Sequence, residues 1–266
     1  NLNQIALKIL WKKNWKKAKN KSDYNIHYIR EPIRLPFFMI TTYQSLPKDK
    51  KIYVASDFHL GSPDLKSSQA REKKIVKWIN SVQEDAAAFI FAGDVFDFWF
   101  EYKEVVPRGF IRFLGKLAEL NERGIDLLFF IGNHDLWMFD YFEKELNATV
   151  YREPQSFQIG VNKIMIGHGD GLGPGDRKFK FFKSIFMNPI AQWGFRWLHP
   201  DVGIKLAKAW SGHSKNHEDP FLGEDEWLVL HCKDVESKDP HDYYIFGHRH
   251  LLLDLPIGKN SMYYNL

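Results

Sequence analysis

Polar residues of the kinds that bind metal ions follow five separate apolar runs of the chain. They are aspartates, histidines and one asparagine, mostly introduced by a glycine: Asp57-x-His59, Gly93-Asp94-x-x-Asp97, Gly132-Asn133-His134-Asp135, Gly167-His168 and Gly247-His248-x-His250. Carboxylate, imidazole and amide ligands together suit Mn, Fe, Zn or Mg rather than a structural zinc held by thiolates. Seven candidate ligands are too many for one ion and indicate two divalent ions that share a bridging carboxylate.

Two such ions would support the hydrolysis of phosphate esters. Cations about 3.5–4 Å apart lower the pKa of a bridging water and clamp the phosphoryl oxygens, so no Ser, Cys or Lys nucleophile is required. We expect His134, beside a candidate ligand, to stabilise the phosphoryl oxygens or to protonate the leaving oxygen. Asp135 could orient that imidazole, and Asp97 is expected behind the ligands rather than among them. Capping of a loop or helix is an equal alternative for both aspartates.

The runs before these residues have the length and composition of buried strands. Three of them, Lys51–Ser56, Ala86–Ala92 and Asp126–Ile131, alternate with two helical patterns, Ser67–Gln83 and a second one opened by Pro107. This alternation predicts parallel strands covered by helices. Ligands of such sheets bind beyond the carboxyl ends of the strands, which is where the polar residues stand.

The two helices carry local signals for their ends and their buried faces. Ser67 or Ser68 is a candidate cap of the first helix, and Gly124 is expected to end the second. The apolar stripes are predicted from the helical spacing of two sets of residues: Ile75, Val76, Ile79 and Val82 in the first helix, and Phe110, Ile111, Leu114, Leu117 and Ala118 in the second.

The second half of the chain is less regular. Phe157–Ile159 and Lys163–Ile166 predict a hairpin around Gly160, and a further strand begins at Tyr243. The intervening residues 172–240 are rich in Phe and Trp interleaved with Lys and Arg. They favour two interpretations equally, ordinary packed helices or an insertion that presents apolar and basic surface to a ligand with both characters.

Composition narrows the class of protein. With 266 residues, 44% of them apolar, the chain can build a large core, and the single cysteine, Cys232, excludes an internal disulfide framework. No apolar run approaches the roughly 20 residues that span a bilayer. The net charge of +4 is uneven, because residues 1–30 carry +7 and the remainder sums to −3. A nucleic-acid-binding function therefore loses most of its support.

Residues 1–38 are predicted to be an appendage to a domain at 39–266. Apolar residues at helical spacing are followed by lysines, which is typical of a basic helix at an anionic membrane surface. A solvated tail is the second interpretation. The third is that Met39 is the natural start and the segment before it is not native.

The ordered set of strand-end residues resembles the calcineurin-like metallophosphoesterase superfamily over residues 51–266. The resemblance implies a four-layer α/β/β/α sandwich with the site at the carboxyl ends of the strands. It also implies two metal sites that share Asp94. One would be held by Asp57, His59, Asp94 and His250, and the other by Asp94, Asn133, His168 and His248.

Within the superfamily, the chain looks most like the UDP-2,3-diacylglucosamine pyrophosphohydrolases of lipid A synthesis. The motifs that carry this likeness are Asp57-Phe58-His59-Leu60-Gly61, Gly93-Asp94-x-Phe96-Asp97-x-Trp99 and His168-Gly169-Asp170 followed by Asp176. The resemblance implies that residues 172–240 form a helical lid, and that substrate contacts come from Asn133, His134, Asp176, Ser211, Lys215 and His248. One departure concerns His134, because well-known members carry Arg there. We also expect another strand or so beyond Leu266.

The preferred function is hydrolysis of UDP-2,3-diacylglucosamine to UMP and 2,3-diacylglucosamine 1-phosphate with two divalent ions, Mn before Fe, Zn or Mg. The resemblance implies a cytoplasmic enzyme, peripheral to the inner membrane of a Gram-negative bacterium, with a nucleotide-sugar lipid as substrate and the inner leaflet as partner. We expect no nucleic acid and no obligate protein partner. The alternatives are a metal-dependent phosphodiesterase or phosphatase acting on nucleotides or another phosphoester, and a membrane-binding protein without catalytic activity.

Overall fold

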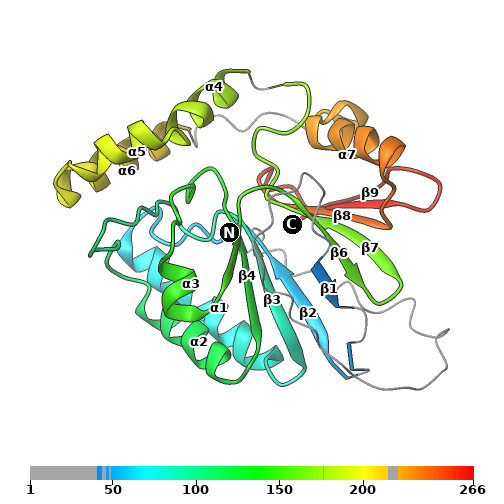
Figure 1. Ribbon diagram of the computed structural model, residues 1–266, viewed down its shortest axis with the longest axis horizontal. Helices are drawn as coiled ribbons and strands as arrows, with labels where there is room; N and C mark the ends of the chain where they lie inside the picture. Colours follow the sequence, from blue (N-terminus) through cyan, green and yellow to red (C-terminus); the bar gives the residue numbers. More distant parts are fainter. Residues whose placement is uncertain (1–40, 44–45, 48, 176, 215–220) are drawn as a thin grey trace.

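Two β-sheets packed face to face form the centre of the molecule (Figure 1). The computed structural model describes residues 41–43, 46–47, 49–175, 177–214 and 221–266. The first sheet is wholly parallel, and its order is β2 (Lys51–Ala55), β3 (Ala86–Ala92), β4 (Asp126–Phe130), β5 (Thr149–Tyr151). The second sheet is mixed, and its order is β1 (Thr41–Tyr43), β6 (Gln155–Ile159), β7 (Asn162–Ile166), β8 (Tyr243–Phe246), β10 (Met262–Asn265), β9 (Leu253–Pro256).

Three helices cover the outer face of the first sheet: α1 (Leu65–Val82), α2 (Ile111–Glu122) and α3 (Tyr141–Leu146). Alternate side chains of a strand point to opposite faces, so β3 supplies Phe89 and Phe91 to this layer and Ile90 to the other. Apolar residues on both faces explain the continuous run Ala86–Ala92, which is buried almost throughout.

The inner layer joins the two sheets, and a third apolar cluster lies beyond the second sheet. Ile90 and Phe130 of the first sheet meet Phe157 and Ile245 of the second. On the far face, Cys232 and its neighbours on α7 (Trp227–Lys238) pack against β8 and β10. The layers are therefore helix, sheet, sheet, helix. The α/β/β/α architecture expected from the sequence is confirmed.

The remaining helices project as a separate group, seen at the upper left of Figure 1. They are α4 (Arg177–Phe186), α5 (Pro189–Arg196) and α6 (Pro200–Ser214), and a short 3-10 helix, η2 (Gly223–Asp225), precedes α7. Aromatic rings fasten this group to the body, because Phe195 of α5 packs against Phe100 and Trp137. The stretch 172–240 thus divides, with α4–α6 standing apart and α7 belonging to the sandwich.

Both helix starts predicted from the sequence need correction. Helix α1 begins at Leu65, and its cap is Asp64, whose carboxylate accepts the Ser67 amide at 2.9 Å. Ser68 is not a cap, because its hydroxyl accepts the amide of Gly61 at 2.8 Å. Helix α2 begins at Ile111 rather than near Pro107. Gly109 and Phe110, just before it, have φ values of 118° and 58°, which a right-handed helix does not contain.

The buried stripe of α2 matches the prediction in part, because Leu117 is buried and Leu114 and Ala118 pack against the same core. Phe113 and Leu120 are buried with Leu117, whereas Ile111 is 79% exposed. Across the parts of the chain that the structure describes, no helix has both the length and the apolar composition needed to cross a membrane.

Candidate metal centre

The ends of five strands meet at one edge of the two sheets. Strands β2, β3 and β4 run parallel in the first sheet, and β7 and β8 run parallel in the second, so the loops that follow them emerge on the same side. The two sets are joined directly, because the amide of His248 donates to the Asp57 carboxylate at 3.1 Å. The structure therefore brings together residues that are up to 193 positions apart, from Asp57 to His250.

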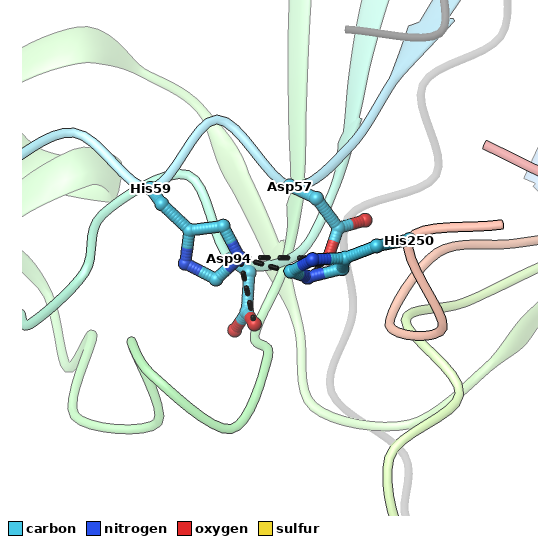
Figure 2. Close-up of side chains that lie close together, drawn as sticks. All are labelled: Asp57, His59, Asp94 and His250. Atoms are coloured by element: carbon cyan, nitrogen blue, oxygen red, sulfur yellow. Dashed lines mark hydrogen bonds and ion pairs between the residues drawn. The ribbon is translucent and has the colours of Figure 1, made fainter. Parts of the chain in front are cut away.

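One group of side chains consists of Asp57, His59, Asp94 and His250 (Figure 2). The Nε2 atoms of His59 and His250 lie 3.0 Å apart. Asp57 Oδ1 is 3.2 Å from His250 Nε2, and Asp94 Oδ2 is 3.7 Å from His59 Nε2. One ligand atom from each residue lies within 4.8 Å of all the others. This is the same set that the resemblance assigns to the first metal.

The second group adjoins the first and shares Asp94. Asn133 Oδ1 is 3.2 Å from His168 Nε2 and 2.9 Å from His248 Nδ1. Asp94 Oδ2 is 3.4 Å from His168 Nε2, so this carboxylate faces both groups. His168 Nδ1 lies 2.9 Å from the Ala92 carbonyl, which fixes a proton on that nitrogen and turns Nε2 toward Asp94 and Asn133, where it can act as a ligand once its own proton is displaced.

The protonation of these groups suits a cation. Burial lowers the pKa of His59 to about 3 and that of His248 to about 4, so both imidazoles are neutral near pH 7. Burial opposes ionisation of Asp94 as well, but the charges of His168 and His134 hold its pKa well below the ordinary value. Burial would lower the pKa of His168, yet Asp94 raises it to about 10. Asp94 and His168 thus form a carboxylate–imidazolium pair. A metal ion can take the place of the imidazolium proton beside the carboxylate.

The donor set fits divalent metal ions. The ring nitrogens of His59 and His250 converge at 3.0 Å and can share only one proton between them, whereas a cation at this point accepts both lone pairs. The neighbouring oxygens come from carboxylates and one amide, and no thiol is near, since Cys232 is buried in the α7 layer. Carboxylate, amide and imidazole ligands are those of Mn, Fe, Zn or Mg.

The loops that carry these groups pack with no spare room. A Cβ added to Gly132 would lie 2.2 Å from Asp94 Oδ1, and one added to Gly247 would lie 2.0 Å from Ser56 Oγ and 2.4 Å from Asp57 Oδ2. All three distances are far below van der Waals contact. Glycine is required at these positions because a ligand from another strand occupies the space of a side chain.

His134 lies beside both groups. Its amide donates to Asp94 Oδ1 at 2.9 Å, and its ring Nδ1 is 3.1 Å from the Asp97 carbonyl, which directs Nε2 toward the cluster. Asp97 Oδ1 is 3.8 Å from His59 Nδ1, on the side of that ring that faces away from His250. This position is compatible with Asp97 behind the ligands, and it also groups Asp97 with His59 and His134 in a set that could hold a metal ion.

Asp135 has different partners from those expected. Its carboxylate accepts the amides of Gly132 at 2.7 Å and Phe96 at 3.2 Å, and the residue is fully buried. These bonds tie the loop after β4 to the loop after β3. Burial and the charge of Asp94 raise the pKa of Asp135 to about 7. Of the two roles considered, the geometry matches capping of a loop, in place of orientation of the His134 ring.

Arg71 is a contributor that sequence reasoning missed. From α1 its Nη1 donates to the carbonyls of Phe58, His59 and Ser62 at 3.0, 2.7 and 3.2 Å. One guanidinium therefore holds the turn that carries His59. No sequence signal identifies it, because Arg71 begins a run of four charged residues, 71–74, that is typical of a solvated helix. Of the remaining expected substrate contacts, Asp176 and Lys215 lie outside the described residues, as do residues 1–38, and Ser211 is placed only as part of α6.

Comparison with known proteins identifies the family to which this chain belongs. The profile of the calcineurin-like phosphoesterase family matches residues 50–252. The chain belongs to the calcineurin-like phosphoesterase family. It is a metal-dependent hydrolase, and the sequence-based recognition of this family and of an enzyme is confirmed.

Several curated relatives of this phosphoesterase share one name. A UDP-2,3-diacylglucosamine hydrolase from Porphyromonas gingivalis is 38% identical over 224 residues, which cover 78% of this chain and 86% of the relative. Another, from Edwardsiella ictaluri, is 27% identical and covers 54% of this chain and 56% of the relative. Among solved structures, the phosphoesterase Yfce from E. coli is 15% identical with a TM-score of 0.37, over 80% of this chain and 77% of that one.

Proposed function

We propose that this phosphoesterase cleaves the pyrophosphate of UDP-2,3-diacylglucosamine to UMP and 2,3-diacylglucosamine 1-phosphate, with two divalent ions, Mn foremost. The observation that carries the proposal is the likeness to the Porphyromonas gingivalis hydrolase, which extends over 86% of that protein. It is supported by a site whose donors suit phosphate ester hydrolysis and by the amphiphilic helices α4–α6, whose character matches a substrate with acyl chains and phosphates.

Two sets of residues would hold the ions. Asp57, His59, Asp94 and His250 would bind one, and Asp94, Asn133, His168 and His248 the other. Bound there, the ions would supply charge that stabilises the phosphoryl oxygens and a water made acidic enough to attack the phosphorus.

The remaining work belongs to side chains around the ions. His134 Nδ1 donates a hydrogen bond to the Asp97 carbonyl, so its Nε2 is directed toward Asp94 and the metal site, where the phosphate would bind. There it can stabilise a phosphoryl oxygen or donate a proton to the oxygen that leaves with the sugar phosphate. The oxygen of the attacking water becomes bonded to the α-phosphorus and leaves in UMP. The bond from that phosphorus to the bridging oxygen breaks, and the bridging oxygen leaves with the sugar phosphate.

The outer face of α5 supports contact with a membrane surface. Ile190, Trp193 and Trp197 recur at helical spacing and are 77%, 62% and 76% exposed. Arg196, which is exposed, lies between Trp193 and Trp197 in the sequence, and Lys205 follows on α6. Tryptophans beside cations are typical of helices that lie at an anionic lipid interface. We therefore place the enzyme at the cytoplasmic leaflet of the inner membrane of a Gram-negative bacterium, where a lipid nucleotide would be presented to it.

Vesicle binding tests this placement. The variant Trp193→Ser with Trp197→Ser is expected to lose most of its co-sedimentation with vesicles of anionic phospholipid, while Val161→Ser keeps it. Val161 is a matched control, because it is 85% exposed but lies at the β6–β7 turn. Equal vesicle binding by all three proteins would contradict the placement.

Hydrolysis assays test the substrate. Release of UMP from UDP-2,3-diacylglucosamine is measured with Mn²⁺, Mg²⁺ and Zn²⁺, beside a soluble aryl phosphodiester and a cyclic nucleotide, with Asp94→Asn as the inactive control. We expect the lipid nucleotide to have the highest kcat/KM. No UMP release, combined with rapid cleavage of the other phosphoesters, would instead support the alternative function, a nucleotide phosphodiesterase or a general phosphodiesterase. His134 favours that alternative, because it stands where well-known members of the pyrophosphohydrolase group carry Arg.

A further inference from the structure

Arg249 stands in the sequence between two candidate metal ligands, His248 and His250. It belongs to the short loop that follows β8, in which His248 and His250 have φ values of 71° and 50°. Residues other than glycine rarely adopt such left-handed backbone, and they keep it only where surrounding contacts impose it. The loop must therefore be held from outside.

The contact that holds it is a two-point ion pair with Glu226. Arg249 Nε donates to Glu226 Oε1 and Nη2 donates to Oε2, the latter at 3.3 Å. The side chain of Glu226 is 3% exposed and that of Arg249 is 17% exposed. A planar guanidinium that meets both oxygens of a carboxylate fixes direction as well as distance.

Glu226 is itself fixed. It is the residue just before α7, and the first turn of that helix packs Leu228 and Val229 into the layer beneath the second sheet. Its Oε2 also accepts a hydrogen bond from the Leu222 amide at 3.4 Å. The pair thus ties the metal-binding loop to the start of α7 and, through the Leu222 amide, to the residue just before η2.

We propose that Arg249 is a positioning residue that holds His248 and His250 in their ligand positions through its ion pair with Glu226, and so supports both metal ions at once. Because the two histidines flank Arg249 and face different groups, a movement of this residue displaces both rings. The buried Glu226 carboxylate gives the pair its rigidity, since separation would leave a charge without a partner in the apolar layer.

The inference rests on the proposed metal centre but not on the identity of the substrate, so its test measures metal retention. Full-length protein loaded with Mn²⁺ is titrated with a chelator, and release of the ion is followed. Arg249→Ala and Glu226→Gln are each expected to weaken retention of both ions by about 10- to 100-fold, the usual effect of removing a group that orients a ligand. Arg249→Lys should restore part of the loss, since it keeps the charge but not the fork.

A matched control and a double variant separate this role from a general loss of stability. Arg123→Ala removes an Arg–Glu pair with Glu84 at an exposed position and should leave metal retention unchanged. Arg249→Ala with Glu226→Gln should be no worse than either single variant, because both break one contact. If Arg249→Ala does not fold, Arg249→Met with Glu226→Met keeps the apolar volume, leaves no buried charge, and is expected to show the same weakened retention.

Two results would overturn the proposal. In the first, Arg249→Ala retains both ions like the unmodified protein and raises only KM, which would make Arg249 a substrate contact. In the second, Arg249→Ala releases metal while Glu226→Gln does not, which would separate the effect from the ion pair. Absence of any Mn²⁺ binding by the unmodified protein would instead refute the metal centre.

Discussion

Five of the seven candidate ligands have left-handed backbone: Asp57, His59, Asp94, His248 and His250. Such conformations cost about 1–3 kcal/mol each in residues other than glycine, and Asp and His accept them more readily than β-branched residues do. The conformation turns each side chain sharply out of its strand direction and into the shared space. Local strain at these residues is therefore part of how the site is built.

At the same scale, His134 is predicted to act on the substrate and not on the metals. His134→Ala should lower kcat for phosphoester hydrolysis by about 100-fold or more, the usual contribution of a general acid, while metal content stays unchanged. Metal analysis by mass spectrometry is run beside the kinetics. His199→Ala, which alters a largely exposed histidine before α6, is the control. Loss of metal in His134→Ala would make the residue a ligand.

His248 and His250 are predicted not to be interchangeable, although only one residue separates them. Each of His248→Ala and His250→Ala should retain about one of the two ions, because His250 adjoins His59 whereas His248 adjoins Asn133. Adding His168→Ala to His250→Ala should remove the remaining ion, and adding His59→Ala should not. If both double variants bind metal equally, the two groups are not separate sites.

At the scale of the element, the metal loops depend on neighbours that lie outside them. Arg71 of α1 holds the turn after β2, Asp135 joins the loops after β3 and β4, and Glu226 before α7 holds the loop after β8. Each of these contacts joins a loop to a helix or to another loop. The strands therefore set the common edge, and the helices set the final positions of the ligands.

Helix α7 is fastened to the second sheet by Glu236. Its carboxylate accepts the hydroxyl of Tyr244 at 2.7 Å, the hydroxyl of Ser261 and the amide of His241. Burial opposes ionisation, but the bonds from Ser261 and Tyr244 lower the pKa of Glu236 below its ordinary value. A lowered folded-state pKa means that this contribution is complete above the unfolded value and is lost as pH falls through the folded one.

Glu236→Gln is therefore predicted to destabilise the protein by about 1 kcal/mol at pH 7, with the difference disappearing in the acid range below about pH 4. Urea unfolding of both proteins at a series of pH values measures this. Glu224→Gln, which alters a well-exposed carboxylate paired with Lys233, should change little. A difference that stays constant over the whole pH range would show that the carboxylate charge is not involved.

For the whole molecule, the site lies across the junction of the two sheets, with ligands from both. Ions bound there would link the halves of the sandwich and stabilise the folded chain, because the unfolded chain has no assembled site. At a Mn²⁺ concentration 100 times the Kd, one site contributes about 2.7 kcal/mol, which corresponds to roughly 5–10 °C in Tm.

Removal of both ions with a chelator should lower Tm by at least that amount, and restored Mn²⁺ should reverse it. Thermal unfolding followed by circular dichroism gives the measurement. Asp94→Asn should show a much smaller response, since Asp94 faces both groups. An unmodified protein whose Tm is indifferent to both chelator and Mn²⁺ would contradict a metal centre shared by the sheets.

Six of the ten described strands, and the ligand types that follow five of them, could be predicted from local sequence patterns, whereas β1, β5, β9 and β10 were not predicted. A buried run such as Ala86–Ala92 followed by Gly93 and Asp94 specifies a strand and the turn after it whatever lies nearby. The start of α2 escaped prediction because Pro107 opens a loop, in which Phe110 adopts a left-handed conformation, and not a helix.

Which side chains meet depends on contacts between segments that are distant in the sequence. Arg249 and Glu226 are 23 residues apart, and nothing in the spacing of either predicts the other. The same holds for Arg71, and for the division of residues 172–240 between a projecting group and a layer of the sandwich. Local patterns fix what each segment is, whereas the packing of the two sheets fixes which ends converge, and the metal centre exists only where they do.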